Sequence, residues 1–246
     1  MDSEYGKRYR ELHENHWWWR AREEIVCEEL RRRLADRTPV TILDVGCGDG
    51  LLFDRLQEFG GVDGIESDGR LVDPDGPHRA RITIAPFDAR FRPEKRYGLV
   101  LMLDVLEHLD ARAAAVSHAL SLLEPGGILV ATVPAFQLLW TNHDRLNQHR
   151  VRFTKASFRR LAADAGMEVV SMRYFFTWLF FAKLAERVKE AVLRSEPQVP
   201  RIPSPRLNAF LCRASRAEEK LARKLGTPLG SSLLVIGRRA AEAKKG

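Results

Sequence analysis

Short apolar segments alternate with amphipathic stretches along most of the chain, and this alternation predicts the fold. The segment 40–45 is mostly apolar, β-branched and bounded by turn residues, a pattern typical of a buried parallel strand. The stretch 21–34 instead carries Ile25, Leu30 and Leu34 at helical spacing. Strands that alternate with helices form βαβ units around a mostly parallel sheet. We expect strands at 40–45, 62–66, 81–85, 97–103, 128–133, 167–174 and 231–238.

The segments between the strands predict helices within a single α/β domain. Pro74, Gly76 and Pro77 interrupt the second crossover, so we expect the helix of that crossover to be short. Helices are expected at 21–34, 51–59, 111–123 and 154–165, and over 175–224 with a proline-rich break at 197–205. We expect one domain over 1–246, made of an N-terminal helical lid (1–38), a core (39–174), a helical insert (175–230), a last strand (231–239) and a disordered tail (240–246).

A glycine-rich turn follows the first expected strand and points to a nucleotide-like ligand. Gly46, Gly48 and Gly50 leave backbone N–H groups bare at the start of a helix, where a ligand can touch the main chain. The G-x-G-x-G spacing is one residue tighter than the G-x-G-x-x-G of NAD sites. Asp44 ends the strand before the turn, where a carboxylate favours a cationic ammonium or sulfonium over a pyrophosphate.

Acidic residues also end the next two expected strands. Glu66 can accept hydrogen bonds from both hydroxyls of a ribose. Asp88 follows the third strand, where it can accept from the exocyclic amine of adenine. Each residue alone could be an ordinary strand-end cap, but carboxylates at successive strand ends in one crevice favour a shared ligand.

These motifs together resemble the class I S-adenosylmethionine-dependent methyltransferases, in the small-molecule branch that includes ubiquinone and menaquinone biosynthesis enzymes. The segment 43–50 resembles their motif I, 64–68 their ribose-binding strand end and 87–89 their adenine contact. The segment 101–109 resembles their fourth-strand motif, and 123–129 resembles the turn before the fifth strand.

The resemblance implies a Rossmann-like sheet of seven strands with a reversed last strand, and S-adenosylmethionine as the cofactor. It also departs from the family pattern at Gly98, where an acid is common, and in the broken second crossover, which leaves one wall of the site undefined. The cofactor-binding residues that it implies, together with those argued above, are Asp44, Gly46, Cys47, Gly48, Glu66, Asp88, Ala89, Leu103 and Asp104.

The expected acceptor site lies in the irregular segment 134–152. Methyl transfer is an in-line displacement, and a general base is needed only when the nucleophile must lose a proton. His143 and His149 are candidate bases, and Asp144 could orient one of them. His108, just past the fourth strand, could face the transferred methyl group or could cap a helix start. The arginines that could clamp an anionic group are Arg145, Arg150 and Arg152.

We expect no metal site, because no spacing in the chain matches a zinc motif. The set that could still assemble one is His143, Asp144 and His149. The segment 134–152 could equally be a polar surface loop whose arginines are solvated.

Two aromatic segments allow more than one interpretation. Three adjacent tryptophans at 17–19 cannot share one helix face, so they fit a lid, a dimer contact or docking of the helix on the sheet. Arg20 or Arg22 could then reach the cofactor carboxylate. The aromatic run 174–184 is either core or, with the basic helix 207–225, an apolar mouth for a lipid-like acceptor at a membrane surface.

Charge and cysteine content limit the partners. The net charge of +7 is spread over helix faces and the tail, and no base-clamping motif is present, so we expect no nucleic-acid partner.

The cysteines, Cys27, Cys47 and Cys212, lack metal-ligand spacing and indicate free thiols in the cytoplasm. The longest apolar run is too short to cross a bilayer. Peripheral membrane contact and the oligomeric state stay open.

Three hypotheses about function follow from these patterns. The first is S-adenosylmethionine-dependent methyl transfer to a small organic acceptor, through oxygen, nitrogen or carbon. The second is the same reaction on a lipid-like or quinone-like acceptor at a membrane surface. The third is a catalytically silent module that binds the cofactor, which the complete set of strand-end acids argues against.

Overall fold

A seven-stranded sheet forms the centre of the computed structural model, which describes residues 3–37, 39–193 and 200–240. The strand order is β3-β2-β1-β4-β5-β7-β6, and β7 alone runs antiparallel to its neighbours. The expected Rossmann-like α/β fold with a reversed last strand is therefore confirmed. The strands are β1 (Val40–Val45), β2 (Gly60–Glu66), β3 (Ile82–Ile84), β4 (Tyr97–Leu103), β5 (Leu123–Pro134), β6 (Met167–Phe175) and β7 (Ser232–Arg239).

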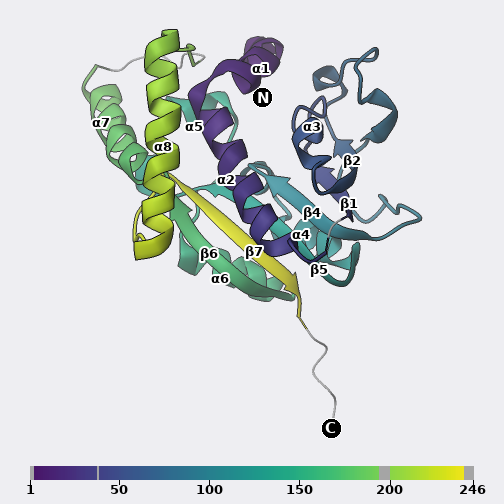
Figure 1. Cartoon of the computed structure of the whole chain (residues 1–246). Helices are drawn as coiled ribbons and strands as arrows, with labels where there is room; N and C mark the ends of the chain where they lie inside the picture. The colour runs from purple at the N-terminus through teal and green to yellow at the C-terminus, as the bar shows by residue number, and fades with distance from the viewer. Residues whose placement is uncertain (1–2, 38, 194–199, 241–246) are drawn as a thin grey trace.

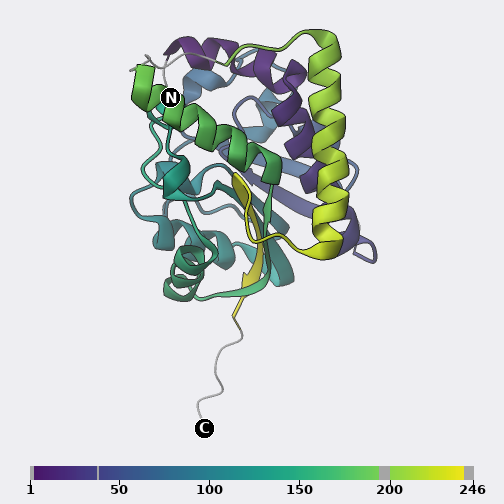
Figure 2. The same cartoon turned by 90° about the vertical axis from the view of Figure 1, so that its left-hand side faces the viewer.

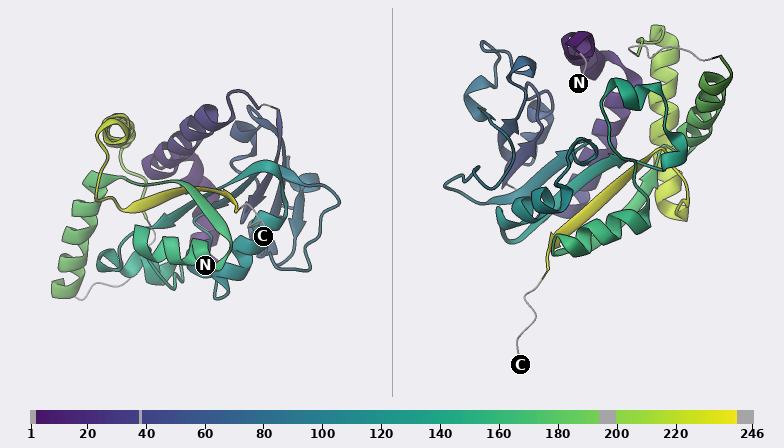
Figure 3. Two further views of the ribbon diagram at one scale, coloured as in Figure 1. Left: turned by 90° about the horizontal axis from the view of Figure 1, so that it is seen from below. Right: turned by 180° about the vertical axis from the view of Figure 1, so that it is seen from behind.

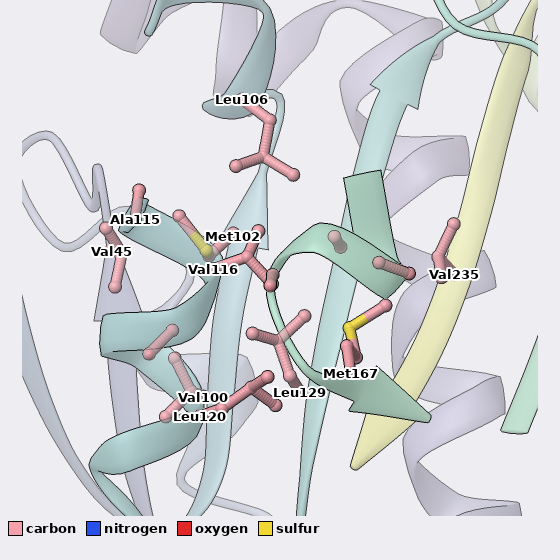
Figure 4. Close-up of a cluster of buried hydrophobic side chains, with 14 of the residues drawn as sticks. Val45, Val100, Met102, Leu106, Ala115, Val116, Leu120, Leu129, Met167 and Val235 are labelled. Atoms are coloured by element: carbon pink, nitrogen blue, oxygen red, sulfur yellow. The ribbon is translucent and has the colours of Figure 1, made fainter. Parts of the chain in front are cut away.

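Helices cover both faces of this sheet (Figures 1 and 3). On one face, α4 and α6 contribute to a buried cluster, and Figure 4 shows their side of the sheet with Val100, Met102 and Leu129 packed against Val116 and Leu120. On the other face lie α2 and α8. The helices are α1 (Ser3–Asn15), α2 (Trp17–Leu34), α3 (Phe53–Leu56), α4 (Arg112–Ser121), α5 (Asn142–Leu146), α6 (Lys155–Asp164), α7 (Thr177–Leu193) and α8 (Pro205–Leu225).

Several boundaries differ from the sequence expectations for local reasons. The helix expected at 51–59 is shortened to α3, because tighter turns flank it, with Phe53 N–H bonding to Gly50 C=O and Phe59 N–H to Leu56 C=O. The strand expected at 128–133 begins earlier, since Leu123 already pairs with Tyr97 ahead of an irregularity in the register.

The second crossover was expected to hold a short helix, and among its residues the structure shows no α-helix at all. It is made of loops and two 3₁₀ turns, Gly69–Leu71 and Arg79–Arg81. The expected disordered tail lies outside the described residues apart from Ala240, and so does part of the proline-rich linker.

The two N-terminal helices and the insert after β6 gather at the carboxyl end of the sheet. Figure 1 shows α1 and α5 above the upper end of the strands, with α7 and α8 to their left. Among the described residues, no helix combines the length and the apolar character needed to cross a bilayer. The three cysteines are free thiols.

Candidate active site

A cavity of about 1030 Å³ opens at the carboxyl ends of the strands. This volume reaches the upper end of the range for small-molecule sites, about 300–1,000 Å³. The glycine turn after β1 and the end of β2 form one part of its wall, and the segment 142–152 forms another. The helix α2 and the helix α7 complete it. One continuous space therefore joins the expected cofactor and acceptor regions.

The glycine turn follows β1 as the sequence predicted, but its backbone N–H groups are not bare. Gly46 and Cys47 donate to Ile65 C=O, Gly48 donates to Glu66, and Gly50 donates to Cys47 C=O. Gly46 and Gly48 adopt φ angles of +72° and +55°, in the region that favours glycine. A Cβ on Gly46 would lie 2.7 Å from a side-chain methyl of Val105, so the turn leaves no room for a side chain there. Gly46 and Gly48 both line the cavity.

Glu66, at the end of β2, holds this turn in place. One carboxylate oxygen accepts from the backbone N–H of Gly48 at 3.0 Å, and the other accepts from Asp68 N–H at 2.8 Å. Glu66 is buried yet lines the cavity. A carboxylate can accept further hydrogen bonds beyond these two, so Glu66 can also receive a ligand hydroxyl.

Asp44 and Cys47 lie buried behind the turn. Burial raises the pKa of Asp44 to about 7, while the charge of Arg22 opposes this shift and Glu66 adds to it. A buried carboxylate with a raised pKa gains most from a cation placed beside it. Cys47 is buried, and its sulfur would lie 2.4 Å from a Cβ on Gly64, so this residue fills the space between β1 and β2.

The end of β4 presents a carboxylate in an unusual backbone conformation. Asp104 has a φ of +57°, and its side chain accepts a hydrogen bond from Thr132 and pairs with Arg22. Arg22 also lies over the ring of Trp18 at 5.1 Å. Leu103, Asp104 and Arg22 line the cavity, whereas Arg20 is exposed on the other side of α2. Of the two arginines considered, Arg22 is therefore the one at the site.

Asp88 and Ala89 lie apart from this cavity. Asp88 pairs with the exposed Arg90 at 2.6 Å and lines a separate, shallower depression beside β2 and β3. The hydrogen bond from Arg90 lowers the pKa of Asp88 to about 2. In this arrangement the structure does not bring the expected adenine contact to Glu66 and the glycine turn.

A buried aspartate orients His149 toward the cavity. Asp144 Oδ1 lies 2.8 Å from His149 Nδ1, and Arg152 binds both carboxylate oxygens of Asp144 at 2.8 and 2.9 Å. Burial opposes ionisation of Asp144, but the hydrogen bond from His149 and the charge of Arg152 hold its pKa well below the ordinary value. An ionised carboxylate only accepts, so the proton sits on Nδ1 and Nε2 keeps a free lone pair.

Glu107 and His108 lie beside His149. Glu107 is fully buried and neither of its carboxylate oxygens has a hydrogen-bond partner, so burial raises its pKa well above the ordinary value. Its Oε1 lies 4.0 Å from His149 Nε2. The rings of His108 and His149 meet edge to face at 4.9 Å, and burial lowers the pKa of His108 to about 4.

Among the residues that the structure describes, one group of potential metal ligands comes together, and it differs from the set named from the sequence. Glu107, His108 and His149 each offer one ligand atom within 4.8 Å of the others. Asp144 is bonded to His149 and Arg152 and so acts behind His149, not as a fourth ligand. The expectation of no metal site is therefore supported only by the lack of a zinc motif in the sequence, and the structure does not add to that support.

The other basic candidates of this segment have partners within the protein. Arg145 donates to the side chain of Asn142, and Arg150 binds Asp110 and the backbone of His108. Burial and the charge of Lys183 keep the pKa of His143 well below its ordinary value. Arg150, Arg152 and Lys183 of α7 line the cavity, whereas Arg145 does not.

Sequence reasoning missed Glu107 and Lys183 as site residues. Glu107 lies inside the segment 101–109, where the sequence analysis considered only the adjacent His108 as an acceptor-site residue. The sequence feature that could have identified Glu107 is its position between Asp104 and His108 in the fourth-strand motif. Lys183 lies in the aromatic run that was interpreted as core or membrane-facing, and only the packing of α7 brings it to the cavity.

Comparison with known families identifies one match. The family described as "Methyltransferase domain" matches residues 18–172. This stretch includes the glycine turn, the ends of β2 and β4, and the segment with Asp144 and His149.

Curated relatives carry related names. A protein of Mycolicibacterium smegmatis named "Probable S-adenosylmethionine-dependent methyltransferase" is 27% identical over 192 residues, covering 76% of this chain and 73% of the relative. A ubiquinone biosynthesis O-methyltransferase of Paramagnetospirillum magneticum is 29% identical over 147 residues. That match covers 57% of this chain and 49% of the relative, so the chain spans about half of that protein.

A solved structure shares the fold. The 1,6-didemethyltoxoflavin-N1-methyltransferase of Burkholderia thailandensis, determined with its substrate and S-adenosylhomocysteine bound, superimposes with a TM-score of 0.55. The alignment covers 92% of this chain and 81% of that one at 17% sequence identity. At this identity the likeness supports the fold, and the acceptor of this chain has to be argued from its own residues.

Proposed function

The chain belongs to the methyltransferase domain family and uses S-adenosylmethionine, and from this premise we propose that it methylates a small organic acceptor with His149 as the general base. One observation carries the proposal. His149, held from behind by the buried Asp144, and the glycine turn line a single cavity large enough for both a cofactor and an acceptor.

The residues around the glycine turn fit S-adenosylmethionine. Glycine is required at position 46 because a Cβ there would meet Val105, so the turn presents backbone without a side chain to the cavity. Glu66 retains acceptor capacity for a ribose, and the buried carboxylate of Asp44 suits the cationic end of the molecule. When bound, S-adenosylmethionine supplies an electrophilic methyl carbon on a sulfonium. Arg22 is the candidate partner for its carboxylate, in exchange for Asp104.

His149 has the geometry of a base that takes a proton from an acceptor. Asp144 fixes the Nδ1–H tautomer and stabilises the imidazolium that forms when Nε2 takes a proton. Arg152 in turn holds Asp144 through two hydrogen bonds, so the imidazole is oriented by a buried pair. The surrounding tryptophans of α2 exclude water from the reacting atoms.

A second candidate acceptor is lipid-like or quinone-like. Trp17, Trp18 and Leu179 give the cavity an apolar wall beside the polar groups of His149 and Lys183. An acceptor with a polar ring and an apolar chain would place its ring at the polar groups and its chain along the apolar wall. One of the relatives is named for ubiquinone biosynthesis, which agrees with that chemistry.

The test is a comparison of His149→Gln with wild type. A panel of phenolic, amine and prenylated acceptors is screened with S-adenosylmethionine, and formation of S-adenosylhomocysteine is measured. We expect kcat of His149→Gln to fall by about 10²–10⁴ while the affinity for S-adenosylhomocysteine is retained. His118→Gln is the matched control, because His118 lies on α4 away from the cavity.

Wild-type turnover in His149→Gln would remove the base from the proposal. Absence of turnover in wild type with every acceptor class, despite tight S-adenosylhomocysteine binding, would instead favour the silent cofactor-binding module.

A further inference from the structure

Exposed apolar side chains concentrate on the two helices inserted before β7. Eight of the eleven large hydrophobic residues that are exposed among the described residues belong to α7 and α8. Neither helix buries them against the rest of the protein. Figure 2 shows both helices on the side of the molecule that faces the viewer. The eight residues are Phe181, Val188, Val192 and Leu193 on α7, and Leu207, Phe210, Leu221 and Leu225 on α8.

On α8 these side chains form a stripe at helical spacing. Phe210, Ala214, Ala217 and Leu221 follow one another at intervals of four, three and four residues, so they share one face of the helix. Phe210 is 61% exposed. An apolar stripe of this kind on a surface helix requires a partner surface to bury it.

Cations flank this stripe, and acids are absent from it. Arg206, Arg213, Lys220 and Lys224 are exposed along its edge, and no acidic side chain of the described residues is paired with them. The two glutamates of the helix turn inward, where Glu218 accepts from Trp178 N–H and Glu219 pairs with Arg173, so they do not reach the exposed face.

The helix α7 carries a second apolar stripe, separate from that of α8 because the two helices make few contacts with each other. Phe181, Ala185, Val188 and Val192 are spaced by four, three and four residues and are all exposed. The opposite side of the same helix carries Lys183, which lines the cavity. A partner that covers this stripe would therefore lie close to the cavity mouth.

We propose that the exposed faces of α7 and α8 form a docking surface for an anionic lipid bilayer. An apolar stripe with an all-cationic edge is the pattern of a helix that lies in the membrane interface. A second copy of the chain fits less well, because a two-fold contact would bring the cationic edge of α8 against its own copy. This surface binds lipid whatever the acceptor is, and it lies outside the residues assigned to methyl transfer.

Vesicle flotation of the full chain tests this surface. We expect binding to phosphatidylcholine vesicles that contain about 30% phosphatidylglycerol, weak binding to phosphatidylcholine alone, and release as salt rises from about 0.1 to about 1 M. Arg213→Gln with Lys220→Gln should weaken binding about thirtyfold, from a factor of about five for each cation removed. Phe210→Glu with Leu221→Glu should abolish it.

Matched controls separate this surface from a general effect of charge or hydrophobicity. Arg159→Gln with Arg160→Gln removes two exposed cations from α6, and Ile84→Glu changes an exposed isoleucine on β3, at an edge of the sheet away from α7 and α8. Both should bind vesicles like wild type, and all variants should keep the wild-type unfolding midpoint. Equal binding to neutral vesicles, no binding to anionic ones, or equal losses in the controls would overturn the proposal. So would a concentration-dependent dimer that Phe210→Glu with Leu221→Glu disrupts.

Discussion

Glu66 combines two roles at the scale of a single residue. Its carboxylate fixes the glycine turn through Gly48 N–H and the start of the next loop through Asp68 N–H. The same buried group faces the cavity, where a ribose would meet it. A residue that shapes the turn and also accepts from the ligand should affect binding more than an exposed acid does.

Glu66→Ala should weaken S-adenosylhomocysteine binding by about 1–3 kcal/mol, the cost of losing hydrogen bonds to a charged group. Titration calorimetry measures this directly. Asp88→Ala is the comparison, because Asp88 pairs with Arg90 outside the cavity and should change the affinity less. Equal losses in the two variants would mean that the second crossover moves to bring Asp88 to the ligand.

Asp44 should make both stability and binding depend on pH. Its pKa is about 7 in the folded protein, whereas an unfolded aspartate has a pKa of about 3.9. The folded state therefore holds a proton between these values that the unfolded state has released, so this residue's contribution to stability falls as pH rises from about 4 to about 7.

A cationic ligand prefers the ionised form of Asp44, so affinity for S-adenosylmethionine, which carries a sulfonium and an ammonium, should rise between about pH 6 and pH 8. Asp44→Asn should flatten that part of the profile. A pH profile in the variant that matches wild type would assign the dependence to another group.

Single site residues could be predicted from the sequence where a strand end fixes the position of a residue with suitable chemistry. The glycine turn and Glu66 could be identified because a strand end fixes both. The pairing of Asp144 with His149 was only one of several options, since it depends on how the segment 142–152 turns. Arg20 and Arg22 could not be separated without knowing which face of α2 meets the sheet.

At the scale of elements, one side chain ties the N-terminal helices to α8. Asn208 accepts from Trp17 N–H at 2.8 Å and donates to Asn15 C=O at 2.7 Å, at the junction of α1 and α2. Asn208 and Trp17 are both buried, so the Trp17 N–H has no water as a substitute partner. The junction positions the tryptophans that line the cavity.

Asn208→Ala should therefore lower the free energy of unfolding by about 1–3 kcal/mol. Thermal unfolding reports this as about 2–4 °C for each kcal/mol in a chain of this size. Arg213→Ala, an exposed change on the same helix, should leave the midpoint unaltered. An unchanged midpoint in Asn208→Ala would show that the junction holds without this side chain.

At the scale of elements, the strands could be predicted from the sequence, whereas the bounds and positions of the helices around the sheet were harder to predict. Buried strands such as β1 and β4 need continuous apolar runs, which stand out in any sequence. The short α3 looked like a longer helix, because the tighter turns around it leave no distinct pattern. The tertiary packing decides that α7 passes beside the cavity, and neither the composition nor the periodicity of α7 predicts that position.

The whole molecule brings the two halves of a transfer site together at one end of the sheet. The glycine turn belongs to the first crossover, whereas His149 comes from the segment after β5, and α2 and α7 close the space between them. The central claim is that this shared cavity binds S-adenosylmethionine, because the assignment of the base depends on it.

The most direct test is the thermal unfolding midpoint of the wild-type chain with S-adenosylmethionine, S-adenosylhomocysteine or NAD in large excess. A ligand at about a hundred times its dissociation constant adds about 2.7 kcal/mol of stability. The midpoint should then rise by about 5–10 °C with both adenosyl compounds and stay unchanged with NAD. A rise with NAD alone, or no rise with any of the three, would contradict the account.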